Sequence, residues 1–255
     1  MTARKPRTVD ASRTLLEVIE ALRVLNGAGV TELADHLDMA KSTVHGHLAT
    51  LEEMEFVTKV NGEYTIGFKF LRLGEHARMR RESYRMAKDI VEELATETNE
   101  RSQFIIEEYG KGVFVHRQVG QNAVHTNTRL GKRIYLHSTG AGKAILAHLP
   151  EERIETIIDT IGLPERTENT ITDRDELYDE LARIRECGYA YNKEEGMAGL
   201  RTIGVPVSDP NGGVLGAFSV SGPSHRIRGD RLHDEIPNML LGKANEFELK
   251  IQFES

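Results

Sequence analysis

Hydrophobic residues near the N-terminus recur at helical spacing in three successive segments, residues 10–25, 30–37 and 41–51. The apolar positions of the last two segments are Val30, Leu33, Leu37, Val44, Leu48 and Leu51. Between these two segments lies Asp38, a residue type that tolerates the left-handed backbone of a tight turn. The pattern predicts three helices, of which the last two form a helix-turn-helix that places its final helix in the DNA major groove.

The outward face of the third predicted helix is rich in hydrogen-bonding side chains. These are Lys41, Ser42, Thr43, His45 and His47. No acidic residue occurs between Met39 and Glu52, and this favours DNA contact because phosphates and base edges repel carboxylates. The alternative interpretation is a pair of ordinary surface helices packed on a core.

A hairpin is predicted directly after these helices. Two short runs, residues 56–60 and 63–66, flank Asn61-Gly62, and both residues of this dipeptide adopt the positive φ that a two-residue turn requires. A hairpin after a recognition helix forms a wing, a combination much more specific for DNA binding than a helix-turn-helix alone. We expect a winged helix-turn-helix domain in residues 1–67, with Lys59 and Asn61 also at the DNA.

The rest of the chain mixes helical and strand patterns. Residues 68–83 are expected to form a linker helix, whose apolar positions fit either a dimer contact or a solvated connection. Further helices are predicted at residues 84–98, 139–148, 150–161, 172–186 and 237–247, and strands at 102–107, 113–119, 124–128, 189–191, 203–207 and 214–221. Thr172, three residues before Asp175, resembles a capping box. Residues 84–255 therefore read as an α+β domain, an antiparallel sheet flanked by helices.

Charge divides the chain at nearly the same place. Residues 1–82 contain 12 basic and 12 acidic residues, so the net charge of −7 belongs entirely to the remainder, with 21 basic and 28 acidic residues. A neutral N-terminal part can still bind DNA through local basic patches. Residues 1–6 lack the apolar run of a secretory signal, and no stretch reaches membrane-spanning length. A soluble, cytoplasmic protein without membrane contact is expected.

The segment from Gly140 to Lys143 superficially resembles a phosphate-binding loop. His137 stands where that loop requires its first glycine, and Ala144 follows the lysine in place of serine or threonine, so this interpretation fails. Residues 139–141 instead predict the start of a helix. The first N–H groups of that helix, on Gly140 and Ala141, favour binding of an anion.

Ser219 and Ser221 lie two residues apart on a predicted strand, so both hydroxyls point to the same side of the sheet. Two hydroxyls on an otherwise apolar face indicate a polar ligand. The alternative is that both hydroxyls are hydrogen-bonded to the backbone.

The sequence carries no recognisable catalytic motif. It lacks a Gly-x-Ser-x-Gly nucleophile elbow, and its ten histidines lack metal-ligand spacing. The single cysteine, Cys187, excludes an internal disulfide framework and, just after a predicted helix C-terminus, is a poor nucleophile. We therefore expect neither catalytic residues nor a metal or cofactor, although an enzyme of small carboxylic acids with an accessory winged helix is the alternative.

Three segments together resemble the IclR-type transcriptional regulators. They are KSTVHGHLATLE, LHSTGAGKAILAHLP and GYAYNKEEGMAGLRTIGVPVSDPNGGVLGAFSVSGP. The resemblance implies a winged helix-turn-helix joined to a GAF-like effector domain, acting as a homodimer or homotetramer on a pseudo-palindromic operator in double-stranded DNA. It also implies control of a catabolic pathway by a small carboxylate. Gly46 departs from the arginine that many members carry at this position.

The resemblance further implies an effector pocket. Its expected residues are Gly140, Ala141, Asn192, Thr202, Ser219 and Ser221. Asn192 and Thr202 replace the frequent Asp and Cys of the family. Because an amide both donates and accepts hydrogen bonds, Asn192 favours a polyhydroxylated ligand such as a sugar acid.

Overall fold

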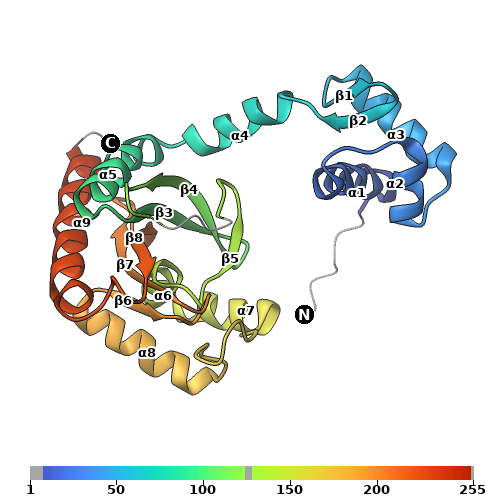
Figure 1. Ribbon diagram of the computed structural model, residues 1–255. Coiled ribbons are helices and arrows are strands. Elements are labelled where there is room, and N and C mark those ends of the chain that lie inside the picture. Colours follow the sequence, from blue (N-terminus) through green and yellow to red (C-terminus); the bar gives the residue numbers. More distant parts are fainter. Residues whose placement is uncertain (1–7, 124–127, 254–255) are drawn as a thin grey trace. The chain divides into compact units, whose positions relative to one another are not determined.

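The N-terminal helices form where the apolar spacing predicts them. In the computed structural model, which describes residues 8–123 and 128–253, these helices are α1 (Asp10–Leu25), α2 (Val30–Leu37) and α3 (Lys41–Glu53) (Figure 1). Their apolar faces meet in a small core. Asp38 ends α2 in the left-handed conformation, with φ of 51°. The predicted helix-turn-helix is confirmed.

The hairpin is also confirmed. Strands β1 (Val57–Val60) and β2 (Glu63–Ile66) pair antiparallel, and the turn residues Asn61 and Gly62 have φ of 53° and 90°. Tyr64 of β2 exchanges two backbone hydrogen bonds, of 2.9 and 3.0 Å, with Ala28 between α1 and α2. This exchange ties the wing to the helices.

Helix α4 (Lys69–Met79) follows the wing, and the chain divides after Ala77 into two compact units. Each residue of α4 is at least partly exposed, and Phe68 and Leu71 present apolar side chains to solvent. Helix α4 therefore begins one residue later and ends four residues earlier than the predicted linker helix, and α5 begins at Glu82.

The second unit is built on a six-stranded antiparallel sheet with the strand order β5-β4-β3-β8-β7-β6. Its strands are β3 (Arg101–Glu108), β4 (Lys111–Val119), β5 (Arg133–Tyr135), β6 (Ala190–Lys193), β7 (Leu200–Ser208) and β8 (Val214–Pro223). The outer strand β5 was not predicted, because three residues are too few for a recognisable alternation. Of the predicted strand at residues 124–128, residues 124–127 lie outside the described residues.

Helices cover both faces of this sheet (Figure 1). One face carries α5 (Glu82–Thr98), a π-helical turn η1 (Arg231–Glu235) and α9 (Ile236–Phe253). The other carries α6 (Gly140–Ala147), α7 (Glu151–Ile161) and α8 (Arg174–Cys187). Phe104 and Phe218 point into the first layer, while their chain neighbours Ile105 and Ala217 point into the second. The predicted α+β fold is confirmed.

The cap of α8 differs from the prediction by one residue. The Asp173 carboxylate, and not the Thr172 hydroxyl, accepts a 3.0 Å hydrogen bond from the backbone N–H of Glu176. Both residue types are good caps, so sequence spacing alone could not distinguish them.

Candidate functional site

The exposed surface of α3 carries the predicted DNA-contacting side chains. Lys41, Ser42, Thr43 and His45 are exposed and His47 is half-buried, whereas Val44 and Leu48 face the core. Helix α3 has Ala40 as its N-cap, which provides no side-chain hydrogen bond, and no acidic residue lies in its first turn. The N-terminal end of α3 therefore offers donors to a phosphate.

The tip of the wing carries the other two predicted DNA contacts. Asn61 is exposed in the turn, and the Lys59 ammonium lies 4.8 Å from the centre of the Tyr64 ring. The neighbouring Tyr64 side chain, by hydrogen bonding first and by charge second, raises the pKa of Lys59. Lys59 is therefore protonated at neutral pH.

A cavity of about 240 Å³ opens on the sheet beside the N-terminus of α6, and its other walls come from residues between 128 and 139, from Arg166 and from residues 196–197. Strand register places two rows of residues on the face of the sheet that carries the cavity. The first row is Asn192, Thr202, Ser221 and Arg101, on β6, β7, β8 and β3. The second row is Gly204, Ser219, Gln103 and Arg117, on β7, β8, β3 and β4.

Hydroxyl groups form a continuous hydrogen-bonded chain along this face of the sheet. Thr202 Oγ1 donates to Ser221 Oγ at 3.0 Å, and Ser221 Oγ donates to Gln103 Oε1 at 3.2 Å. Ser219 Oγ donates to the same Gln103 oxygen at 2.8 Å. The partner of the two serines is thus a side chain, Gln103, and not the backbone. In this arrangement the serines offer lone pairs to a ligand, and a flip of the Gln103 amide would free their protons for donation.

The N-terminus of α6 lies directly on strand β7. A Cβ atom on Gly204 would come within 2.4 Å of the Ala141 backbone nitrogen, and one on Gly140 within 3.0 Å of the Thr202 carbonyl oxygen. Glycine at both positions is what allows this approach. Ala141 lines the cavity, whereas Gly140 is used in the contact with β7 and does not line it among the described residues. The Thr139 hydroxyl caps the helix by accepting from Gly142 N–H at 3.1 Å.

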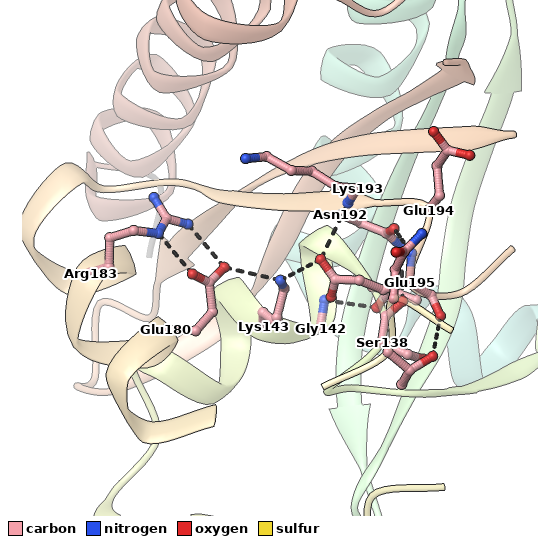
Figure 2. A network of polar contacts seen from close by, with 12 residues as sticks. Ser138, Gly142, Lys143, Glu180, Arg183, Asn192, Lys193, Glu194 and Glu195 are labelled. Carbon is pink, nitrogen blue, oxygen red and sulfur yellow. Dashed lines mark hydrogen bonds and ion pairs between the residues drawn. The ribbon is translucent and has the colours of Figure 1, made fainter. Parts of the chain in front are cut away.

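Asn192 lines the cavity, and its side chain is hydrogen-bonded both to the segment before α6 and to the segment after β6 (Figure 2). Its amide nitrogen donates to the carbonyl oxygen of Ser138 at 2.8 Å, and its amide oxygen accepts from the backbone N–H of Glu195 at 2.8 Å. One N–H and one lone pair of the amide remain for a ligand.

The described lining of the cavity contains four cationic and no acidic side chains, the cations being Arg101, Lys132, Arg133 and Arg166. Arg133 is paired with Glu108, at 3.6 Å between the charged atoms. Arg166 lies with its guanidinium carbon 5.9 Å from the centre of the Tyr135 ring. Ile105, Phe114, Ile134, Met197 and Leu200 supply the apolar part of the wall. The cavity therefore suits a small anion that also has an apolar or stacking surface.

Two family models match this chain. The IclR helix-turn-helix domain matches residues 14–61, and the bacterial transcriptional regulator IclR C-terminal domain matches residues 76–248. The chain belongs to the IclR family. Both of its units are thereby accounted for, the first as a DNA-binding domain and the second as an effector-binding domain of a transcriptional regulator.

Similarity to other IclR-type regulators extends over nearly the whole chain. A "Probable HTH-type transcriptional regulator ArcR" of Halobacterium salinarum is 32% identical over 252 residues, which cover 97% of this chain and 96% of that protein. The HTH-type transcriptional regulator KdgR of Escherichia coli is 30% identical over 236 residues, covering 91% and 89%. The crystal structure of the Thermotoga maritima IclR superposes with a TM-score of 0.81 at 29% identity, covering 95% of this chain and 99% of that one.

Five of the six residues predicted to bind the effector of this IclR-type regulator line this one cavity. The contribution of β3 was not predicted. Arg101 and Gln103 stand at alternate positions of that strand, and Ile105 continues the same face. Because Ser102 between them is also polar, no polar-apolar alternation in the sequence marked Arg101 and Gln103 as facing one side. What the sequence did not contain was the register that sets β3 beside the serines of β8.

A buried ion-pair network joins α6, α8 and the segment after β6 (Figure 2). Lys143 of α6 is 1% exposed, and its ammonium donates to Glu195 at 2.8 Å and to Glu180 at 3.0 Å. Arg183 binds the same Glu180 carboxylate with contacts of 2.8 and 3.0 Å. Burial raises the pKa of Glu195, while the Arg183 and Lys143 charges hold the pKa of Glu180 below its usual range despite its burial. The lysine of the apparent phosphate loop is thus a structural cation.

Two negative findings apply to the described residues. Within residues 8–123 and 128–253, no helix is long and apolar enough to cross a membrane. Across the same ranges, histidine, cysteine, aspartate and glutamate side chains do not gather in threes as a metal site would require.

Proposed function

We propose that this chain is a non-enzymatic regulator of a catabolic pathway that binds a small carboxylate in the cavity on β3, β7 and β8. The supporting observation is the lining of this cavity, in which cations and hydroxyls face the ligand space and acids are absent among the described residues. The helix N-terminus at Ala141 and the amide of Gln103 are the proposed carboxylate contacts. Thr202, Ser219 and Ser221 would bind hydroxyl groups of a sugar acid. Asn192 would hold the segments at Ser138 and Glu195 in place beside the ligand.

The effector proposal is tested by calorimetry of the full-length protein with a panel of small carboxylates that includes sugar acids. Gln103→Glu preserves the acceptor for both serines but adds a negative charge, so we expect carboxylate binding to weaken about tenfold or more. Gln118→Glu, which adds the same charge at an exposed glutamine of β4 outside the cavity lining, is the matched control and should bind normally. Unchanged affinity of the Gln103 variant would show that the cavity is not the carboxylate site.

A turnover assay on each bound compound tests the non-enzymatic part of the proposal. A regulator becomes more stable as the concentration of its effector rises but leaves the compound intact. Conversion of the bound acid by purified protein, at a rate abolished by excess non-reactive ligand, would favour the alternative of an enzyme with an accessory winged helix.

We further propose that DNA is read by α3 and the wing of a homodimer. Ser42, Thr43 and His45 would contact bases, with His47 near them, while Lys41, Lys59 and Asn61 would contact the backbone. Exposed apolar residues on α1 and α4 support pairing through these helices. They include Leu16, Leu71 and Leu73. Two-fold symmetry would give a pseudo-palindromic operator with half-sites about 34–36 Å apart or a multiple of that spacing.

Selection of bound fragments from genomic DNA, with the mass of the complex measured in solution, tests this proposal. His45→Ala should relax base preference, whereas Lys41→Ala should weaken binding to all sequences about equally. Lys88→Ala, which removes an exposed lysine from the other unit, is the charge-matched control. A monomer that binds a single half-site tightly would contradict the dimeric arrangement, and an unchanged preference in a triple variant of Ser42, Thr43 and His45 would contradict the base contacts.

A further inference from the structure

One cation at the cavity comes from the loop between α7 and α8. Arg166 of this loop lines the cavity, and its guanidinium carbon lies 5.9 Å from the centre of the Tyr135 ring, which lines the cavity too. Within residues 8–123 and 128–253, the Arg166 side chain takes part in no ion pair. A guanidinium that lies against an aromatic ring can keep the N–H donors at its edge available, so Arg166 can offer them to a ligand.

Hydrogen bonds fix the loop backbone on both sides of Arg166. Before it, Nε2–H of His137 donates to the carbonyl oxygen of Pro164 at 3.1 Å. After it, the buried Thr170 hydroxyl accepts from the backbone N–H of Arg166 at 3.0 Å and donates to the carbonyl oxygen of Glu195 at 2.6 Å. The position of Arg166 at the cavity is therefore set by its backbone and does not depend on a charged partner.

The same hydrogen bonds connect Arg166 to another part of the cavity wall. The backbone N–H of Glu195 donates to the amide oxygen of Asn192, a residue of the cavity lining, at 2.8 Å. Asn192 and Arg166 are thus joined through Glu195 and Thr170. The loop that carries Arg166 and the end of β6 therefore form one connected wall beside the ligand space.

The charges around Arg166 favour an anion at this wall. Arg133 of the same lining already has an anionic partner, because it lies 3.6 Å from the Glu108 carboxylate and also donates to the Glu108 carbonyl oxygen at 2.8 Å. Lys111 lies 4.0 Å from the centre of the Tyr135 ring, so this ring is in contact with two cations, Lys111 and Arg166. Like charges repel each other, and an anion bound beside Arg166 offsets this repulsion.

Building on the proposed function, we infer that Arg166 is a specificity-determining residue that selects a carboxylate over an uncharged ligand. Its guanidinium binds the effector carboxylate through two parallel N–H donors, a geometry that matches the two carboxylate oxygens. The α6 N-terminus supplies only partial charge and the Gln103 amide none, so a full positive charge discriminates more strongly between an acid and its amide. Arg166 therefore sets the preference for the acid.

Calorimetry of the full-length protein with three acids and their amides tests this inference. The pairs are gluconate with gluconamide, lactate with lactamide and benzoate with benzamide. A charge-assisted contact corresponds to about ten- to hundredfold in affinity, and the exposure of Arg166 favours the lower value. The acid that binds best should therefore bind about tenfold more tightly than its amide.

Variants of Arg166 assign this preference to its charge. Arg166→Gln should weaken binding of the acid about tenfold and leave binding of the amide unchanged. Arg166→Lys keeps the charge but loses the paired donors, so it should retain part of the preference. Arg228→Gln, which removes an exposed arginine that does not line the cavity, is the charge-matched control and should change neither affinity.

The outcomes separate this inference from the proposal on which it rests. Equal weakening of acid and amide by Arg166→Gln would show that Arg166 shapes the loop without recognising charge, and a preference that survives the substitution would assign selection to another group. Either result overturns the inference, while a loss of acid binding in Gln103→Glu would leave the proposed carboxylate site standing. Absence of binding by all three acids would overturn both.

Discussion

The buried Lys143 network supports a quantitative prediction for Lys143→Met. The lysine and Glu195 side chains are only 2% and 8% exposed, so the substitution leaves the Glu195 carboxylate buried with a single backbone donor, Lys193 N–H at 3.2 Å. Glu180 keeps its charge partner Arg183, so the loss of stability arises mainly at Glu195. Removing one partner of a buried ion pair costs about 3–5 kcal/mol of unfolding free energy. For a unit of this size the loss lowers Tm by about 6–20 °C.

This loss should depend on pH with a definite sign. Burial raises the pKa of Glu195 above its unfolded value, and removal of the Lys143 charge raises it further. A carboxyl whose folded pKa is raised binds more protons in the folded state, so its contribution to stability falls as pH rises from the unfolded pKa to the folded one. The deficit of the variant is therefore largest near neutral pH and shrinks as pH falls towards the unfolded value of about 4.3.

Urea unfolding of the full-length protein, followed by circular dichroism at about pH 5 and about pH 8, measures both effects. Adding Glu195→Gln to Lys143→Met removes the stranded charge and should recover most of the lost stability. Lys193→Met, at the exposed lysine that ends β6, is the matched control and should change the unfolding free energy little. A deficit below about 1 kcal/mol, or one that grows as pH falls, would refute the reasoning.

Three further predictions concern individual residues. Gly46→Ala should raise the unfolding free energy by about 1 kcal/mol, because a Cβ there meets no atom within 4 Å; an unchanged operator affinity would show that DNA does not fill this space. Gly204→Ala should lower stability by about 1–3 kcal/mol in thermal unfolding, since its Cβ would lie 2.4 Å from Ala141 N, and wild-type stability would contradict that close approach. Thr139→Val should cost about 1 kcal/mol in urea unfolding through loss of the α6 cap, and no cost would mean that the cap is dispensable.

The sequence by itself determined the local elements of this protein. Helical spacing in α1 to α3, the positive-φ pair Asn61 and Gly62 and the polar outer face of α3 were sufficient to predict the winged helix-turn-helix. These features depend on residues close together in the chain, where periodicity and turn chemistry act directly. The serine pair on β8 was predictable for the same reason, because alternation on one strand sets which side chains share a face.

Only the tertiary structure decided which strands lie beside β8. Pairing of β3 with β8 brings Gln103 to Ser219 and Arg101 to Ser221, across more than one hundred residues of chain. Register between strands so distant is set by packing of both sheet faces, and no local pattern records it. The same holds for Lys143, whose two carboxylate partners come from α8 and the segment after β6. The sequence excluded a phosphate loop at Lys143, but only the packing of α6 showed that this lysine is a buried structural cation.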